Sequence, residues 1–174
     1  MYISAPRDKR FFIECAQEVA EGRGDKWFYP PDEFRDLDNV QILDKVMKEL
    51  WLSNLVLMDV SMKHFNDEFY PNSGVMIEFG LLMNDTRKGL DYVYLFCDEN
   101  TERNNLPPMI PRVEVEKYSE GEENEENFKK TILQALQDFE RKAPDREQQA
   151  REAKIALQSL YELSRNKPFS TSKS

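Results

Sequence analysis

The residues at positions 55–60, Leu-Val-Leu-Met-Asp-Val, constrain the fold more than any other part of the sequence. Apolar side chains occupy consecutive positions there rather than alternate ones. Consecutive side chains of a strand point to opposite faces of its sheet, so both faces of this strand must be covered. The sequence therefore predicts an α/β protein in which residues 55–60 form a central parallel strand.

Other short β-prone segments alternate along the chain with amphipathic helical segments. This alternation predicts parallel strands joined by right-handed crossovers, as in a flavodoxin-like or Rossmann-like three-layer sandwich. We expect a five-stranded, mainly parallel sheet with strand order 2-1-3-4-5, a polar loop at 61–72, and an edge strand at 113–118. The expected strands are 2–4, 27–29, 55–60, 92–97 and 113–118, and the expected helices are 7–21, 42–51, 74–85 and 128–139.

The domain organisation follows from the last part of the chain. Residues 1–143 are expected to form the α/β domain, followed by a C-terminal helical extension at 144–166 and a flexible tail at 167–174. The extension has its own apolar stripe beyond the usual α/β unit. It is expected either to pack against a neighbouring subunit or to fold back on its own domain, because an isolated helix gains little stability without packing.

Charge and composition narrow the classes of partner. The formal net charge of −9 argues against a protein that binds duplex nucleic acid through its phosphates, but leaves a small nucleotide possible. No apolar run approaches the roughly 20 residues of a membrane span, so no membrane partner is expected. Two isolated cysteines, Cys15 and Cys97, favour a reducing, cytoplasmic location. His64 is the only histidine, and the sequence predicts no metal and no cofactor.

The helical segment 74–85 carries one carboxylate, Glu78, in an otherwise apolar run. A buried ionised carboxylate is costly unless it is paired or faces water or a ligand. Glu78 lies about one turn into the helix that follows the central strand, where doubly wound sheets bind ligands. A functional acid is one interpretation, and a solvent-facing glutamate is the other. Gly80 costs about 1 kcal/mol relative to Ala in a helix, which is expected where the backbone approaches another strand or a ligand.

Two sequence patterns together resemble the nucleoside 2-deoxyribosyltransferase superfamily, which includes the deoxynucleoside monophosphate N-glycosidases. The first is the apolar strand that ends at Asp59, followed by residues 72–80, Asn-Ser-Gly-Val-Met-Ile-Glu-Phe-Gly. The second is the N-terminal strand with Tyr2. The resemblance covers about the first 120 residues. It implies an enzyme that cleaves or transfers an N-glycosidic bond of a nucleoside or nucleotide, with Glu78 as the nucleophile.

The resemblance also implies roles for other residues. Tyr2 is expected to donate a hydrogen bond that orients Glu78. Asp59 is expected either to act on the leaving base or a sugar hydroxyl, or to hold the loop that follows its strand. The predicted substrate-binding residues are Ser4, Arg7, Asn72, Ser73 and Gly74.

Simpler structural roles are open for several of these residues. Asn72 is also expected where a turn begins, and Ser73 has the pattern of a helix N-cap. Arg7, Lys9 and Arg10 suit a 5′-phosphate near a helix N-terminus, or form an ordinary solvated helix end. They replace the glycine-rich phosphate loop of the monophosphate N-glycosidases, and the loop before Asn72 is longer than in that family.

Two alternative functions are compatible with the same residues. A short glutamate motif of this kind also resembles that of the TIR-like nucleotide-binding proteins, which implies cleavage of NAD at its nicotinamide bond in defence or signalling. A nucleotide-binding sensor without turnover is the non-enzymatic alternative. The family resemblance further implies a homodimer or a higher homo-oligomer.

Overall fold

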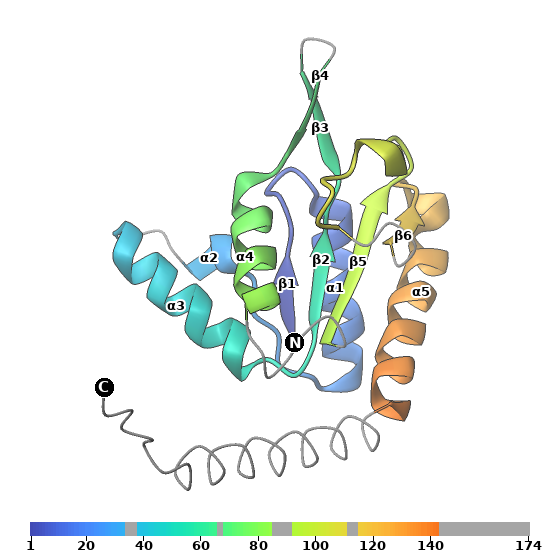
Figure 1. The fold of residues 1–174 in the computed structure, drawn as a ribbon. Coiled ribbons are helices and arrows are strands. Elements are labelled where there is room, and N and C mark those ends of the chain that lie inside the picture. Colours follow the sequence, from blue (N-terminus) through green and yellow to red (C-terminus); the bar gives the residue numbers. More distant parts are fainter. Residues whose placement is uncertain (34–37, 66–67, 85–91, 111–114, 143–174) are drawn as a thin grey trace, which may run out of the picture. The chain divides into compact units, whose positions relative to one another are not determined.

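The computed structural model describes residues 1–33, 38–65, 68–84, 92–110 and 115–142 (Figure 1). The expected C-terminal helix at 144–166 and tail at 167–174 lie outside the described residues. The chain divides into two compact units, Met1–Phe139 and Glu140–Ser174. The fold described below is that of the first unit. Within the described residues, no helix combines the length and the apolar character needed to cross a membrane.

Four parallel strands form the main sheet, which confirms the predicted α/β fold with a parallel sheet. Their order is β1-β2-β5-β6, so residues 55–60 contribute the central strand β2 and the last strand lies at an edge. Tyr2 pairs with Val56 and Val56 pairs with Val93, which sets the register of the first three strands. The strands are β1 (Tyr2–Ser4), β2 (Val56–Asp59), β5 (Val93–Asp98) and β6 (Val115–Tyr118).

The expected fifth strand at 27–29 is reduced to one bridge in the described structure. Phe28 forms a single parallel bridge with Tyr2, and its backbone exchanges hydrogen bonds of 2.9 and 3.0 Å with Ile3 and Met1. The short helix α2 (Pro30–Glu33) begins two residues later. Proline has no N–H to donate to a strand and favours the first position of a helix. The described structure thus shows one bridge rather than a full strand at 27–29, and this bridge lies beside β1, as predicted.

Alternate strand residues enter two hydrophobic clusters, because successive side chains of a strand point to opposite faces. One cluster joins Ile3, Leu57 and Phe96 to the helices α1 (Arg10–Arg23) and α5 (Glu122–Arg141). The other joins Tyr2 and Met58 to α3 (Asn39–Leu52) and α4 (Ser73–Asn84). Both faces of the central strand are thus covered, as its continuous apolar pattern requires (Figure 1).

Local capping residues fix the ends of two helices. After α1, Gly24 adopts a left-handed conformation with φ of 74°, and its N–H returns to the last turn. Before α3, the Asp38 carboxylate accepts hydrogen bonds from the backbone of Val40 and Gln41. The Gln41 side chain in turn accepts from the Asp38 backbone, which completes a capping box.

The segment 61–72, expected to be a polar loop, contains a β-hairpin. Strands β3 (Met62–Phe65) and β4 (Glu68–Pro71) pair antiparallel, with Met62 opposite Pro71 and Phe65 opposite Glu68. The hairpin projects beyond the carboxyl end of β2 (Figure 1). A short η2 turn (Arg103–Asn105) follows β5. The hairpin was missed because polar residues interrupt its aromatic and other β-prone residues.

Replacing Gly80 by Ala is expected to raise the free energy of unfolding by about 1 kcal/mol. The predicted approach to another strand is not seen, because a Cβ at this position would meet no atom of the rest of the described structure within 4 Å. Alanine would therefore gain helix propensity without a clash. Urea denaturation monitored by circular dichroism measures the change. As a control, Gly24→Ala should lower stability, because its φ of 74° suits only glycine well. Destabilisation by Gly80→Ala would contradict the expectation.

Candidate functional site

Glu78 projects from α4 toward β1, where two hydroxyl groups hold its carboxylate. The Tyr2 hydroxyl donates a hydrogen bond of 2.9 Å to Oε1. The Ser4 hydroxyl donates a hydrogen bond to Oε2. Tyr2 and Ser4 are two residues apart in one strand, so their side chains leave the same face of the sheet. The sequence anticipated the Tyr2 bond, but it assigned Ser4 to the substrate rather than to Glu78.

Burial makes Glu78 a weaker acid than a glutamate in water. Desolvation raises its pKa, the hydrogen bonds from Ser4 and Tyr2 lower it, and the balance is a pKa of about 7. The pKa of Tyr2 is raised by its burial and by the adjacent Glu78 carboxylate. The phenol therefore keeps its proton and remains a hydrogen-bond donor. With a pKa of about 7, the Glu78 carboxyl can readily gain or lose a proton at neutral pH.

Glu78 also lines a cavity of about 460 Å³, formed by the turn after β1 and the helices α2, α3 and α4. Pockets of this size bind small molecules, and they typically combine apolar walls with a few polar groups. Arg7, Asn72 and Glu78 are the residues of this lining that carry charged or hydrogen-bonding side chains. The rest of the lining consists of Ala5, Pro6, Pro30, Pro31, Ile42, Leu43, Val46, Gly74, Val75 and Ile77.

The start of α4 differs from its expected form. The Asn72 Oδ1 accepts a hydrogen bond of 3.2 Å from the Val75 backbone N–H, so Asn72 caps the helix. Ser73 is the first helical residue, and the prediction that Ser73 is the N-cap was wrong. A Cβ on Gly74 would lie 3.2 Å from Asn72 Oδ1, so glycine leaves room for the cap. Asn72 and Gly74 line the cavity, whereas Ser73 does not.

Asp59 lies in a different environment, buried at the carboxyl end of β2. It has no exposed surface, and it does not line the cavity that contains Glu78. Its Oδ1 accepts a bond of 2.7 Å from the Ser61 backbone, and its Oδ2 accepts one of 2.5 Å from the Tyr118 hydroxyl. Burial raises the pKa of Asp59, and these hydrogen bonds oppose the rise. Of the two predicted roles for Asp59, this geometry favours holding the loop after β2.

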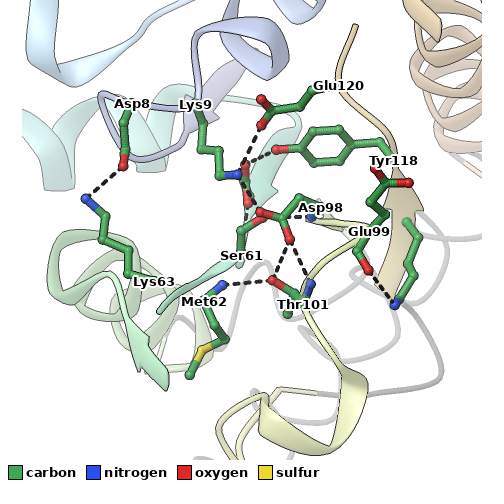
Figure 2. Close-up of polar contacts among 12 residues, drawn as sticks. Asp8, Lys9, Ser61, Met62, Lys63, Asp98, Glu99, Thr101, Tyr118 and Glu120 are labelled. Carbon is green, nitrogen blue, oxygen red and sulfur yellow. Dashed lines mark hydrogen bonds and ion pairs between the residues drawn. The ribbon is translucent and has the colours of Figure 1, made fainter. Parts of the chain in front are cut away.

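A second polar cluster joins the ends of β2, β5 and β6 to the turn before α1 (Figure 2). Lys9 Nζ lies 2.5 Å from the Asp98 carboxylate and 3.0 Å from Glu120. Asp98 also accepts two hydrogen bonds of 2.8 Å from Thr101, and its own N–H donates to the Ser61 hydroxyl. Nothing in the sequence distinguished the role of Lys9 from those of Arg7 and Arg10. In the structure, Lys9 belongs to this cluster and the two arginines do not.

These contacts set the charges in the second cluster. Burial alone would raise the pKa of Asp98, but the hydrogen bonds from Lys9 and Thr101 hold it below its usual range. Burial alone would lower the pKa of Lys9, but its bonds to Asp98 and Glu120 raise it. Both groups are therefore charged at neutral pH and satisfy one another. This cluster has a structural role, because it holds the strand ends together. Glu78, in contrast, lines a cavity.

The described residues contain no group of three or more His, Cys, Asp or Glu side chains that could hold a metal ion. No protein-family model and no curated protein matches this sequence. The functional argument therefore depends on the chemistry of the site itself.

Replacing Glu78 by Gln should stabilise the protein at high pH but not at low pH. The pKa of Glu78 is about 7 in the folded protein, against a model value of 4.5, so the folded state holds this proton more tightly than the unfolded chain. Folding stability contributed by the protonated carboxyl is therefore lost as the pH rises between these values. The loss amounts to at most about 3 kcal/mol, and glutamine avoids it.

Urea denaturation of both proteins from about pH 4 to about pH 8 measures this difference. The gap in unfolding free energy should open between the two pKa values and then stay constant. Glu116→Gln, an exposed substitution on β6, is the matched control and should show a much smaller change with pH. A gap for Glu78→Gln that is the same at every pH would show that this carboxyl is not desolvated in the folded protein.

The second cluster makes a separate prediction about stability. Thr101→Val keeps the shape of a buried side chain but removes its hydroxyl, which donates to Asp98 and accepts a bond of 3.0 Å from the Met62 backbone. Leaving Met62 N–H without this acceptor should lower the free energy of unfolding by about 2 kcal/mol. In the control, Thr131→Val, the lost hydroxyl bonds only the Asn127 carbonyl on the surface of α5. Equal losses of stability for the two variants in thermal denaturation would refute the structural role of this cluster.

Proposed function

We propose that this protein breaks the N-glycosidic bond of a nucleoside or nucleotide, with Glu78 as the nucleophile. The glycosyl group then passes to water or to a second base, which makes the protein an N-glycosidase or a deoxyribosyltransferase. The observation that carries the proposal is the Glu78 carboxylate, held by Tyr2 and Ser4 in the wall of a mostly apolar cavity. The resemblance to the nucleoside 2-deoxyribosyltransferase superfamily adds the reaction type.

The chemistry follows from the position and the pKa of Glu78. In its ionised form, one carboxylate oxygen attacks the anomeric carbon of the sugar and forms a C–O bond. The C–N bond breaks, and its electron pair leaves with the base, which takes up a proton. Water or a second base then attacks the anomeric carbon, and the C–O bond to Glu78 breaks, which restores the free carboxylate. The proton that the attacking molecule loses to solvent balances the one that the departing base takes up from solvent. A carboxylate is suited to this step because it stabilises the positive charge that develops on the sugar.

The two hydroxyls on β1 have a physical role in this reaction. Each donates to one oxygen of Glu78, so they fix the plane of the carboxylate before the substrate binds. Their hydrogen bonds also favour the ionised form, which is the nucleophile. Tyr2 and Ser4 are therefore positioning residues. Asp59 lies outside the cavity lining, and the proposal does not use it as an acid.

The cavity suits a substrate that consists of a planar aromatic base and a polar sugar. Its apolar walls suit a planar base, and Arg7 and Asn72, which line the cavity, are proposed to bind sugar or phosphate oxygens. The proposal also includes the finer features that the resemblance implies: a five-stranded, flavodoxin-like three-layer fold, a cytoplasmic location and a homodimer or larger assembly. The bridge at Phe28, beside β1, supports the fifth strand.

The test is release of free base. The wild-type protein is incubated with deoxynucleosides, their 5′-monophosphates and NAD, and the products are separated by chromatography. Glu78→Gln should lower the rate by at least about a thousandfold, because the covalent step is lost. Tyr2→Phe should lower it by about ten- to a hundredfold, because the carboxylate is less well oriented. The rate should fall below about pH 7 as Glu78 becomes protonated.

Glu116→Gln is the matched control and should retain full activity, because Glu116 is exposed on β6 and lines neither Glu78's cavity nor the second cluster. Nicotinamide release from NAD alone would identify the TIR-like alternative. Binding of these ligands without release of any base would overturn the enzymatic proposal and leave the nucleotide-binding sensor.

A further inference from the structure

A second cavity lies next to the first and differs from it in chemistry. It has a volume of about 390 Å³ and is formed mainly by α1. Arg7 and Pro31 line both cavities, so the two are contiguous at these residues. The other residues of its lining are Arg10, Ile13, Glu14, Gln17 and Tyr29.

The two arginines of the second cavity are available to a ligand. Both are exposed, and within the described part of the chain neither forms an ion pair with a carboxylate. The nearby Lys9, by contrast, is engaged by Asp98 and Glu120. Because the whole protein carries a net charge of −9, two unengaged cations at one cavity are a local exception to its charge.

The beginning of α1 adds to this positive character. Arg10 is the first residue of the helix, and the N-cap residue, Lys9, makes no side-chain hydrogen bond to the helix. The first turn also contains no acidic residue. The N–H groups of this turn thus lack a side-chain acceptor, and the positive end of the helix dipole is not offset by a carboxylate. Such a helix start stabilises a bound phosphate.

The other residues that line the second cavity suit the other parts of a nucleotide. Ile13 and Tyr29 are buried and provide apolar surface. Glu14 and Gln17 follow Arg10 on the same face of α1, one and two turns further along. A carboxylate and an amide can accept hydrogen bonds from sugar hydroxyls. The second cavity thus combines cations, hydrogen-bond acceptors and apolar surface.

We infer that the substrate extends from the Glu78 cavity into the second cavity through two linked phosphates, as in a nucleoside diphosphate or a dinucleotide. This inference rests on the proposed function for the sugar end of the molecule. Arg7, at the shared wall, binds the phosphate next to the sugar. Arg10, which lines only the second cavity, binds the next phosphate. Arg10 thereby selects substrates with two phosphates over substrates with one.

Calorimetric binding to Glu78→Gln tests the inference, because this variant cannot turn the ligand over by the proposed route. The probes are adenosine, AMP, ADP and inorganic pyrophosphate. ADP should bind at least about tenfold more tightly than AMP, as expected for added charge-assisted hydrogen bonds. Adding Arg10→Gln should remove the advantage of ADP over AMP and weaken pyrophosphate binding by about tenfold. Adding Arg23→Gln should change neither, because Arg23 lies at the other end of α1 and lines neither cavity.

Equal affinity for AMP and ADP would overturn the inference, and so would pyrophosphate binding that does not respond to Arg10→Gln. Either result is compatible with base release from nucleosides by the wild-type protein, so the proposed function would stand. Conversely, Arg10-dependent binding of ADP by a protein that releases no base would support the binding site while overturning the proposed reaction.

Discussion

The carboxylate of Glu78 and the two hydroxyls of β1 form the interaction on which the site depends. They join residues that are 74 and 76 positions apart in the sequence, and they fix α4 against the first strand of the sheet. The hydrogen bonds do not fully compensate burial, since the pKa remains raised to about 7. A purely structural position would gain stability from an uncharged side chain. The cost to folding is therefore best explained by a chemical role.

A comparison of the buried carboxyls distinguishes Glu78, the candidate catalytic group, from carboxyls whose contacts hold the fold together. Asp59 also has a raised pKa, but it is completely enclosed and both its oxygens accept hydrogen bonds from the fold. Asp98, at the carboxyl end of β5, is paired with Lys9. Of the three carboxyls of Glu78, Asp59 and Asp98, only that of Glu78 lines the cavity of about 460 Å³. A raised pKa alone would not have distinguished Glu78 from Asp59.

The sequence predicted features that depend on local pattern and missed those that depend on tertiary placement. The central strand, the helices and the parallel sheet follow from hydrophobic periodicity, and the Tyr2–Glu78 contact followed from the family resemblance. The alternation of β1 could also have placed Ser4 beside Tyr2. The partnership of Lys9 with Asp98, 89 residues away, has no local signal because it depends on where the loops meet. The segment 27–29 forms one bridge rather than a full strand for a local reason, because prolines begin α2 directly after it.

In the proposed reaction the two cavities impose opposite electrostatic demands, and Arg7 lines both of them. A phosphate bound near Glu78 adds negative charge, which would raise the pKa of this carboxyl further and reduce the fraction present as the nucleophile. A cation between the two anions favours both charged forms. Arg7 is a cation that lines both cavities, and the hydrogen bonds from the β1 hydroxyls already favour ionised Glu78. In the proposed reaction, substrate binding and ionisation of Glu78 are therefore compatible at neutral pH, although the protein as a whole is acidic.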